Sequence, residues 1–396
     1  MRNNHKGHYA VMEMSPRQST KSGPLRVLLV AARYLPYMGG LETHVYEVGR
    51  RLVGAGVEVT VLTTDVSGTL PTVEDIEGKK IRRVRAWPAK RDYYFAPGIY
   101  SAITHGQWDI IHCQGYHNLV PPLAMLAALR ANVPFVLTFH SGGNVTPLRR
   151  AARKIHWEML RPLLSQAQKL IAVSRFEADF FQDHLRLPPE RFVVIPNGAY
   201  LPQVMEPVES KFSEPDSAPL IISVGRLERY KGHQRVIAAM PKVLEQIPKA
   251  RLRIAGSGPY ESNLLEMARK LRVERQVEIR AVAPEDRGGM AALLSRASLI
   301  TSLSEYESQG IAVMEALSLG CPVLVANNSA LREFASLDLA CGVPLESTPE
   351  QLAKAIVRQL LQPIMPQSIA LPTWDDCASS LLALYQTIAR RTICAS

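Results

Sequence analysis

The sequence has few cysteines, no long apolar run and no metal-ligand spacing, and each absence excludes a class of protein. The five cysteines are too irregularly spaced for a disulfide framework or a zinc site, so we expect reduced, mostly buried thiols. They are Cys113, Cys321, Cys341, Cys377 and Cys394. No window approaches about 18 uninterrupted apolar residues, which argues against a transmembrane helix. Residues 1–24 lack the apolar segment of a secretory signal and are predicted to be a disordered tail before a cytoplasmic domain.

The charge of the chain narrows the range of partners. A net charge of +10 and a pI of 9.4 predict an anionic partner, which could be nucleic acid, anionic lipid or a phosphorylated small molecule. No helix–turn–helix, zinc-finger or RNA-recognition signature is present, so nucleic acid is not expected as a partner. With 47% hydrophobic and 21% charged residues, the composition is that of a globular protein.

Short apolar runs alternate with helical patterns from residue 25 onward, which predicts parallel sheets flanked by helices. The runs fall at 25–32, 57–64, 109–113, 134–140, 169–174, 192–197, 220–225, 251–256 and 297–303. The series starts afresh near residue 219, after a Pro- and Glu-rich stretch at 201–219 that has linker composition. The predicted fold class is therefore α/β, with two Rossmann-like, doubly wound domains in tandem.

Ligands of such sheets bind beyond the carboxyl ends of the strands, and a glycine pair follows the first run. Gly39 and Gly40 end a loop and open an amphipathic helix, so their amides would suit a phosphate or a developing oxyanion. A plain turn before a helix needs the same glycines, and the two interpretations are equally favoured.

Two cations follow the run at 220–225. Arg226 and Lys231 lie in the loop that opens the next helix, where they match a diphosphate. The alternative is a solvated charged loop, but the pairs Gly225-Arg226 and Lys231-Gly232 frame the segment and favour a binding role.

Two acids surround a glycine after the run at 297–303. Gly310 opens a helix whose first amides could meet a phosphate, while Glu315 reaches a ribose and Glu307 lies beside a sugar. The alternative is an acid that stabilises its own helix dipole, followed by an exposed glutamate.

Together these segments resemble the signature set of glycosyltransferase family 4, which has the GT-B fold. The resemblance covers residues 25–390, and it rests on GG at 39–40, GRLERYKG at 225–232, IAGSGPY at 254–260 and ESQGIAVMEA at 307–316. It implies an acceptor domain at 25–205, a nucleotide-sugar donor domain at 206–370, and a helix at 371–396 that crosses back to the first domain.

The resemblance also implies an activity. The expected enzyme retains anomeric configuration and moves a sugar from a nucleotide-diphosphate sugar, UDP- or GDP-linked, to a hydroxyl of a glycan, a lipid-linked or a small-molecule acceptor. Cell-surface polysaccharide or glycolipid synthesis is the expected setting. No metal or other cofactor is expected, and the absence of an Asp-x-Asp sequence agrees with that. The alternatives are a nucleotide-sugar epimerase of the same fold and a non-catalytic nucleotide-sugar-binding subunit.

The family's residue roles can be carried over by position. Arg226 and Lys231 would bind the diphosphate, Glu315 the ribose, and Glu307 with the Gln309 and Gly310 amides the sugar. The implied catalytic residues are His140, Arg226, Lys231 and Glu307, with His117 as an acceptor contact. The implied donor-binding residues are Gly39, Gly40, Arg226, Lys231, Gly256, Glu307, Gln309, Gly310, Ile311 and Glu315. A structural histidine remains the alternative for His140.

Other matching positions are expected to be structural, and some positions depart from the family. Ser174 reads as a helix N-cap and Asn197-Gly198 as a turn, while His112 and His117 are expected past a strand end. Tyr200 stands where the family often has an acid, and Gln309 where it often has an aromatic residue. The segment 327–333 lacks the usual glycine pair.

One helical segment, 146–164, combines five cations with apolar residues. That composition suits an anionic membrane surface, and it predicts peripheral contact with the inner face of the cell membrane. A solvated basic helix face is the alternative.

Overall fold

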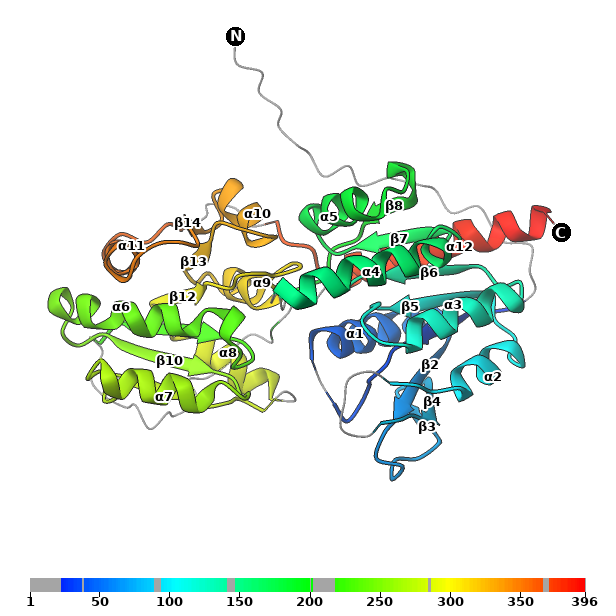
Figure 1. Ribbon diagram of the computed structural model, residues 1–396, viewed down its shortest axis with the longest axis horizontal. Helices are drawn as coiled ribbons and strands as arrows, with labels where there is room; N and C mark the ends of the chain where they lie inside the picture. The colour runs from blue at the N-terminus through cyan, green and yellow to red at the C-terminus, as the bar shows by residue number, and fades with distance from the viewer. Residues whose placement is uncertain are drawn as a thin grey trace, which may run out of the picture.

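The computed structural model describes residues 23–37, 39–88, 94–140, 147–199, 201, 218–283, 286–365 and 370–395. The predicted tail at 1–24 and linker at 201–219 lie almost entirely outside the described residues. The described chain forms two α/β domains that lie side by side (Figure 1), which confirms the prediction of two doubly wound domains.

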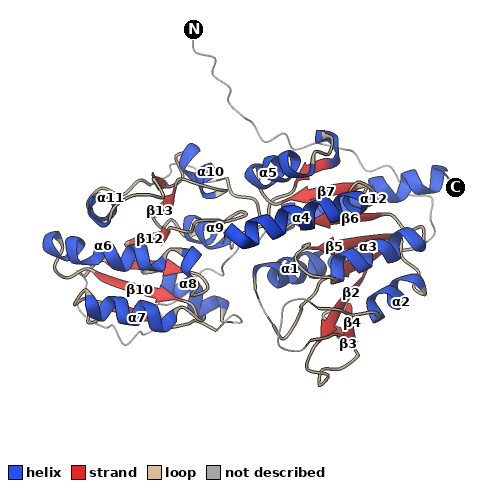
Figure 2. Cartoon of the chain, in the orientation of Figure 1, coloured by secondary structure: helices blue, strands red, loops and turns tan. Residues whose placement is uncertain are grey.

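The N-terminal domain contains an eight-stranded sheet in the order β3-β4-β2-β1-β5-β6-β7-β8. Only β3 is antiparallel, to β4. The strands are β1 (Arg26–Val30), β2 (Glu58–Asp65), β3 (Val73–Ile76), β4 (Lys79–Arg85), β5 (Ile110–Gln114), β6 (Phe135–Thr138), β7 (Lys169–Ala172) and β8 (Phe192–Val194). The helices are α1 (Gly40–Gly54), α2 (Gly98–Thr104), α3 (Val120–Arg130), α4 (Pro147–Leu164), α5 (Arg175–Leu185) and the 3₁₀ turn η1 (Pro189–Arg191). Helices flank the sheet, so its central strands are buried and apolar (Figure 2).

The C-terminal domain contains a six-stranded, wholly parallel sheet in the order β11-β10-β9-β12-β13-β14. Its strands are β9 (Leu220–Val224), β10 (Arg251–Ala255), β11 (Val277–Ile279), β12 (Leu299–Ser302), β13 (Val323–Ala326) and β14 (Cys341–Val343). The helices are η2 (Arg229–Lys231), α6 (His233–Gln246), α7 (Glu261–Lys270), α8 (Arg287–Ser295), α9 (Ile311–Ser318), α10 (Leu331–Ser336) and α11 (Pro349–Leu361). Each of the nine apolar runs found in the sequence contains a strand.

The last helix, α12 (Trp374–Ala395), returns to the N-terminal domain (Figure 1). Its side chains Trp374, Leu381 and Tyr385 are buried in the same apolar cluster as Val45 and Leu52 of α1. Helix α12 therefore completes the core of a domain whose other elements lie at the opposite end of the sequence.

The chain passes between the two cores over a few residues. Ile195 packs in the N-terminal core and Leu201 in the C-terminal core, somewhat before the boundary at residue 205 that the sequence suggested. The segment that returns to the N-terminal domain contacts the segment that leaves it, because the Ala199 amide donates to the Pro372 carbonyl at 3.1 Å. A Cβ on Gly198 would lie 2.0 Å from the Trp374 nitrogen, so only glycine fits at this crossing.

The described cysteines and helices agree with the expectations from composition. Cys113, Cys321 and Cys377 are buried free thiols, and Cys341 is a half-buried one. Within the described ranges, no helix is both long enough and apolar enough to span a bilayer.

Candidate functional site

Three loops of the C-terminal domain meet beyond the carboxyl ends of β9, β10 and β12. The Gly225 amide donates to the Ala255 carbonyl at 3.1 Å, which joins the first two loops. The Glu305 amide donates to the Tyr230 carbonyl at 2.7 Å, which joins the first and third. The sequence motifs at 225–232, 254–260 and 307–316 thus form one surface, as expected for an open parallel sheet.

Lys231 and Glu307 form an ion pair at the centre of this surface. The Lys231 Nζ lies 2.7 Å from Glu307 Oε1, and both side chains are more than four-fifths buried. The Ser304 hydroxyl donates to the same carboxylate oxygen at 2.7 Å. Because Lys231 is held rather than solvated, the description of this segment as a solvated charged loop is wrong for Lys231.

Arg226, the second cation of this loop, has a side chain that is 67% exposed. Its guanidinium donates to the Tyr230 hydroxyl at 2.6 Å and pairs with Glu228 at 2.9 Å. Below it, the His233 Nε2–H donates to the Arg226 carbonyl at 3.2 Å while Nδ1 accepts from Ser223 at 2.8 Å. The backbone of Arg226 is therefore fixed although its side chain can reach outward.

Two glycines allow these loops to pack closely. A Cβ on Gly256 would lie 1.9 Å from the Gly225 carbonyl oxygen, and one on Gly232 would lie 2.0 Å from the Leu303 carbonyl oxygen. Gly232 also has a φ of +79°, a conformation that favours glycine. Gly256, predicted to bind a donor, has at least this packing role in the structure.

Glu315 is buried near the middle of α9 and pairs with Arg287 of α8. Burial raises the pKa of Glu315, while Arg287 opposes that shift. The alternative of an exposed glutamate here is wrong, because the residue is only 6% exposed. Gly310, with a φ of +89°, caps the helix, and Ile311 is the first, half-buried residue of α9.

The glycine pair of the N-terminal domain does not form a turn. Gly39 is extended, with φ −148° and ψ −171°, and Gly40 does not have a positive φ. A Cβ on Gly40 would meet no atom within 4 Å. The interpretation that a tight turn requires both glycines is therefore wrong, and Gly40 presents open backbone at the start of α1.

The carboxylate of Glu42 lies at this helix start. It accepts hydrogen bonds from the amides of Gly39 and of Glu42 itself, and it feels the charges of Arg33 and of Arg226. Burial nonetheless raises the pKa of Glu42. Since Arg226 belongs to the other domain, the start of α1 lies near the loop that follows β9.

His140 lies beyond β6 on the N-terminal side of this opening. It adopts a left-handed conformation, with φ +45°, and its Nε2–H donates to Gln114 Oε1 at 2.8 Å. Burial lowers the pKa of His140 well below its ordinary value, and neighbouring histidines, exposed His117 among them, lower it further. His140 is thus neutral and fixed in orientation.

His112 was expected past a strand end, and this was wrong. It lies inside β5, fully buried, with Nδ1 2.5 Å from the Tyr385 hydroxyl of α12 and Nε2 2.7 Å from Thr138 Oγ1. His112 therefore joins the sheet to α12 and does not face an acceptor.

Asn197 and Gln309 connect the domains. The Asn197 amide donates to Gln309 Oε1 at 2.9 Å, and Gln309 Nε2 donates to the Asn197 carbonyl at 3.0 Å. No turn occurs at Asn197-Gly198, so that prediction was wrong. The N-cap role of Ser174 is confirmed, since its side chain accepts from the Glu177 amide. With its side chain engaged by Asn197, Gln309 leaves only its backbone for a donor.

A second contact between the domains involves the segment that lacks the usual glycine pair. Glu333 of α10 accepts from the Phe176 amide at 2.7 Å, at the N-terminus of α5. The Phe176 and Tyr306 rings meet edge to face at 5.6 Å. A carboxylate at a helix N-terminus is stabilising, so Glu333 caps a helix of the opposite domain.

Buried neutral histidines predict a loss of stability in acid. Burial lowers the pKa of His44 and of His233 to about 4, from an ordinary value of 6.5. Below pH 6.5 the unfolded chain binds protons that the folded protein excludes, so the free energy of unfolding should fall as the pH drops from 6.5 towards 4. Each group contributes a slope of up to about 1.4 kcal/mol per pH unit. Urea unfolding at a series of pH values measures this slope.

The variant His233→Gln removes one of these groups and should reduce that slope by up to about 1.4 kcal/mol per pH unit. The variant His105→Gln, at an exposed position, should leave the slope unchanged. Equal slopes in all three proteins would show that the buried histidines do not govern acid stability.

Several residues that the structure places here were not predicted from the sequence. The contacts of His44 and Arg287 are with residues that are distant in the chain. The ionisation of Glu42 and His233 is altered by burial. A polar residue directly or shortly after a glycine at a helix start is the sequence signal that could have identified Glu42 and His233.

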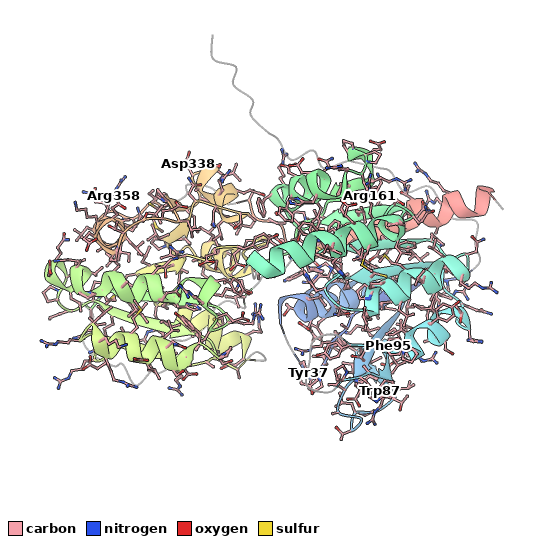
Figure 3. All side chains as sticks on the ribbon, in the orientation of Figure 1. Tyr37, Trp87, Phe95, Arg161, Asp338 and Arg358 are labelled. Atoms are coloured by element: carbon pink, nitrogen blue, oxygen red, sulfur yellow. The ribbon has the colours of Figure 1, made fainter. Side chains whose placement is uncertain are left out.

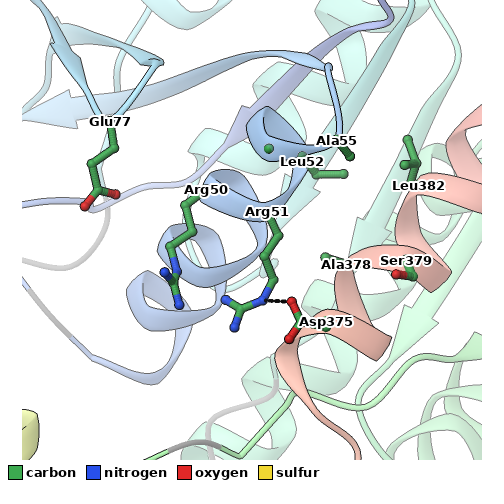
Figure 4. Close-up of a pocket in the computed structure, with 10 residues that line it drawn as sticks. Arg50, Arg51, Leu52, Ala55, Glu77, Asp375, Ala378, Ser379 and Leu382 are labelled. Carbon is green, nitrogen blue, oxygen red and sulfur yellow. Dashed lines mark hydrogen bonds and ion pairs between the residues drawn. The ribbon is translucent and has the colours of Figure 1, made fainter. Parts of the chain in front are cut away.

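One cavity of the described chain lies away from this surface. About 630 Å³ in volume, it lies between the C-terminal half of α1 and the start of α12, where Arg51 pairs with Asp375 at 2.7 Å (Figure 4). None of its lining residues is a predicted site residue. Across the described ranges, no three His, Cys, Asp or Glu side chains gather as a metal site would require.

Comparison with known families matches both halves of the chain. The family described as Glycosyltransferase Family 4 matches residues 38–201, and the one described as Glycosyl transferases group 1 matches residues 205–370. A D-inositol 3-phosphate glycosyltransferase of Nocardiopsis dassonvillei is 28% identical over 390 residues, covering 88% of this chain and 89% of that protein. A glycogen synthase of Mycobacterium tuberculosis is 29% identical over 340 residues, covering 78% and 80%.

Solved structures resemble the whole chain. Sucrose-phosphate synthase from Thermosynechococcus elongatus has a TM-score of 0.72 at 20% identity, covering 94% of this chain and 100% of that one. Anabaena HepE, solved in complex with UDP-glucose, has a TM-score of 0.66 at 16% identity, also covering 94% and 100%. At such identities the likeness concerns the fold.

Proposed function

Because the chain belongs to the glycosyltransferases that join a family 4 domain to a group 1 domain, we propose that it transfers a sugar, with retention, from a nucleotide-diphosphate sugar to an acceptor hydroxyl. The predicted GT-B fold and the enzyme class are confirmed by the same comparisons. The observation that carries the proposal is the buried Lys231–Glu307 pair, in the same loop as Arg226, whose charge acts on Glu42 at the start of α1.

The arrangement suits departure of a nucleoside diphosphate. Lys231 and Arg226 would lie beside the diphosphate leaving group as it gains negative charge. The mostly buried, ion-paired Lys231 would stabilise that charge with little screening by water, and the exposed Arg226 would add a second cation. Glu307 would accept sugar hydroxyls, and Glu315 would accept a ribose hydroxyl. The Gly40 amide, unobstructed and at a helix N-terminus, would approach the phosphate from the other domain.

The proposed reaction is a front-face displacement. The bond between the anomeric carbon and the diphosphate oxygen breaks as the acceptor oxygen attacks from the same face. The acceptor proton passes to the departing phosphate oxygen, so no protein nucleophile is needed. His140, neutral and held by Gln114, would orient the sugar as a hydrogen-bonding group.

UDP and GDP sugars are the proposed donors, and a UDP sugar is supported by the ligand of HepE. The acceptor is proposed to be a hydroxyl of a glycan, a lipid-linked or a small molecule, and two of the similar proteins are named D-inositol 3-phosphate glycosyltransferase and glycogen synthase. Cell-surface polysaccharide or glycolipid synthesis is the proposed setting.

The test is release of nucleoside diphosphate from a panel of UDP and GDP sugars, with and without candidate acceptors. Release from one donor, above that of Lys231→Ala, would establish transfer or hydrolysis and identify the sugar. Conversion of the donor without release of the diphosphate would instead support the epimerase alternative. Donor binding without either reaction would support the binding-subunit alternative.

We also propose that α4 contacts an anionic membrane surface. Its described part exposes Ile155 and Met159, one turn apart, at 63% and 73%. The cation Arg161, labelled in Figure 3, is partly exposed on a different side of the same helix. The remaining predicted cations, at 149, 150, 153 and 154, have side chains outside the described residues. Apolar side chains flanked by cations are typical of interfacial helices.

We expect the protein to sediment with phosphatidylglycerol vesicles at low salt, and the double variant Ile155→Ser/Met159→Ser to bind several-fold less. Leu265→Ser, at a 38% exposed apolar position of the other domain, is the matched control. No sedimentation of the unmodified protein would rule the contact out.

A further inference from the structure

The side chain of Gln309 bonds both backbone groups of Asn197, in the segment that connects the two domains. Its Oε1 accepts from the Asn197 amide at 2.9 Å, and its Nε2 donates to the Asn197 carbonyl at 3.0 Å. Nε2 also lies 3.2 Å from the Met314 sulfur in α9. Gln309 is 6% exposed and Asn197 is 3% exposed. The side-chain amide of Gln309 therefore bonds the N–H and the C=O of Asn197 as a neighbouring β-strand would, and both of its polar atoms have partners although they are buried.

Asn197 occupies the point at which the chain leaves the N-terminal domain. Ile195, two residues earlier, belongs to the N-terminal core, while Leu201 belongs to the C-terminal core. Gly198 is in close contact with Trp374, where the chain returns. The Gln309 contact consequently attaches a loop of the C-terminal domain to the segment about which the domains would rotate.

The same asparagine binds the N-terminal domain through its side chain. His44 Nδ1–H donates to Asn197 Oδ1 at 2.6 Å, and burial keeps His44 neutral by lowering its pKa to about 4. His44 lies one helical turn after Gly40 on α1. A continuous hydrogen-bonded path thus runs from the start of α1, through Asn197, to the residue that precedes the start of α9.

The ends of this path are the two helix starts that the proposed function assigns to the donor. Gln309 lies between Glu307, which binds Lys231, and Gly310, which caps α9. We infer that Gln309 is a positioning residue: its contact with Asn197, relayed by His44, fixes the Glu307–Gly310 loop relative to the Gly39–Gly40 backbone. This inference rests on the proposed function for its catalytic consequence, but the geometric coupling stands independently.

The first test is Gln309→Met, which keeps the length of the side chain and removes both hydrogen bonds. The kcat/KM for transfer should fall about 10- to 100-fold, the range expected for two buried hydrogen bonds expressed in the transition state. The ratio of donor hydrolysis to transfer should rise, because a displaced N-terminal domain would let water reach the donor sugar. Gln359→Met, at another buried glutamine of the same domain that bonds the Ile364 amide, should leave both quantities unchanged.

The second variant, Gln309→Glu, separates positioning from general packing. Ionised, it places a carboxylate oxygen against the Asn197 carbonyl; protonated, it can donate to that carbonyl as the amide does. Its transfer rate relative to the unmodified protein should therefore recover as the pH is lowered from about 8 to about 5.5. If Gln309→Glu only disturbed packing, its transfer rate relative to the unmodified protein would not recover as the pH is lowered.

Small-angle X-ray scattering tests the geometric coupling without any substrate. Loss of the contact should broaden the interdomain distance distribution of Gln309→Met but not that of Gln359→Met. Unchanged scattering, or an unchanged hydrolysis-to-transfer ratio with no pH-dependent recovery in Gln309→Glu, would overturn the inference. If the unmodified protein transfers no sugar at all, the proposed function fails, and the scattering result still decides the coupling.

Discussion

Replacing Lys231 with alanine is expected to lower turnover of the nucleotide-sugar donor on the order of 10²–10³-fold. The Nζ of Lys231 is held 2.7 Å from Glu307 and is mostly buried, so its charge acts on a leaving diphosphate with little screening by water. Steady-state kinetics with the donor found in the panel measure the effect. The loss should appear mainly in kcat, since charge develops on the diphosphate only as the bond breaks.

This prediction needs a control for stability, because removal of Lys231 leaves the buried Glu307 carboxylate with Ser304 as a partner. The double variant Lys231→Ala/Glu307→Gln removes that unpaired charge and should recover unfolding free energy without recovering turnover. Lys242→Ala, which removes a surface ion pair with Glu245, should change neither. Near-normal turnover in a folded Lys231→Ala protein would disprove the assigned role.

Replacing Gly232 with alanine is expected to destabilise the C-terminal domain by more than about 4 kcal/mol. The new Cβ would lie 2.0 Å from the Leu303 carbonyl oxygen, and a backbone atom cannot rotate away as a side chain can. The left-handed φ of +79° adds roughly 1–2 kcal/mol. Because Gly232 follows Lys231 directly, the shift would also displace the cation from Glu307. Urea unfolding and the donor assay together measure both consequences.

Gly320→Ala is the matched control for this change. Gly320 has a similar φ of +72° in the same domain, but a Cβ there would meet nothing within 4 Å. The control should therefore show only the backbone cost of about 1–2 kcal/mol. If both variants lost the same stability, the close approach to Leu303 would be without energetic effect.

Most of the central strands could be predicted from the sequence, while the edge strands β3, β11 and β14 could not. The exceptions are the edge strand β8, which was predicted, and the inner strands β4 and β13, which were not. Strands such as β1, β5 and β9 are buried on both faces, so they appear as continuous apolar runs. In contrast, β4 has five cations and only two apolar residues, Ile81 and Val84, and β3 pairs with it at the sheet edge. A search for apolar runs overlooks strands of this kind, because their outer face meets water.

The candidate site was predictable where residues that act together are near each other in sequence. Lys231 and Arg226 share one loop, and Glu307 and Gly310 share another. The partners of Glu315 and Gln309 were not predictable, because Arg287 and Asn197 are brought to them by packing. Gln309 shows the limit most clearly: a sequence position associated with a sugar carries a side chain that serves the chain crossing.

The return of α12 to the first domain has a consequence for how the protein is made. Val45, Val48 and Leu52 of α1 share an apolar cluster with side chains of α12, such as Leu381 and Ile388, which the ribosome adds after the whole C-terminal sheet. The domain translated first therefore stays incomplete until translation has passed residue 388, whereas the domain translated second can close earlier. During synthesis the incomplete N-terminal domain exposes the apolar surface that α12 later covers, so we expect chaperones to bind it before the chain is finished.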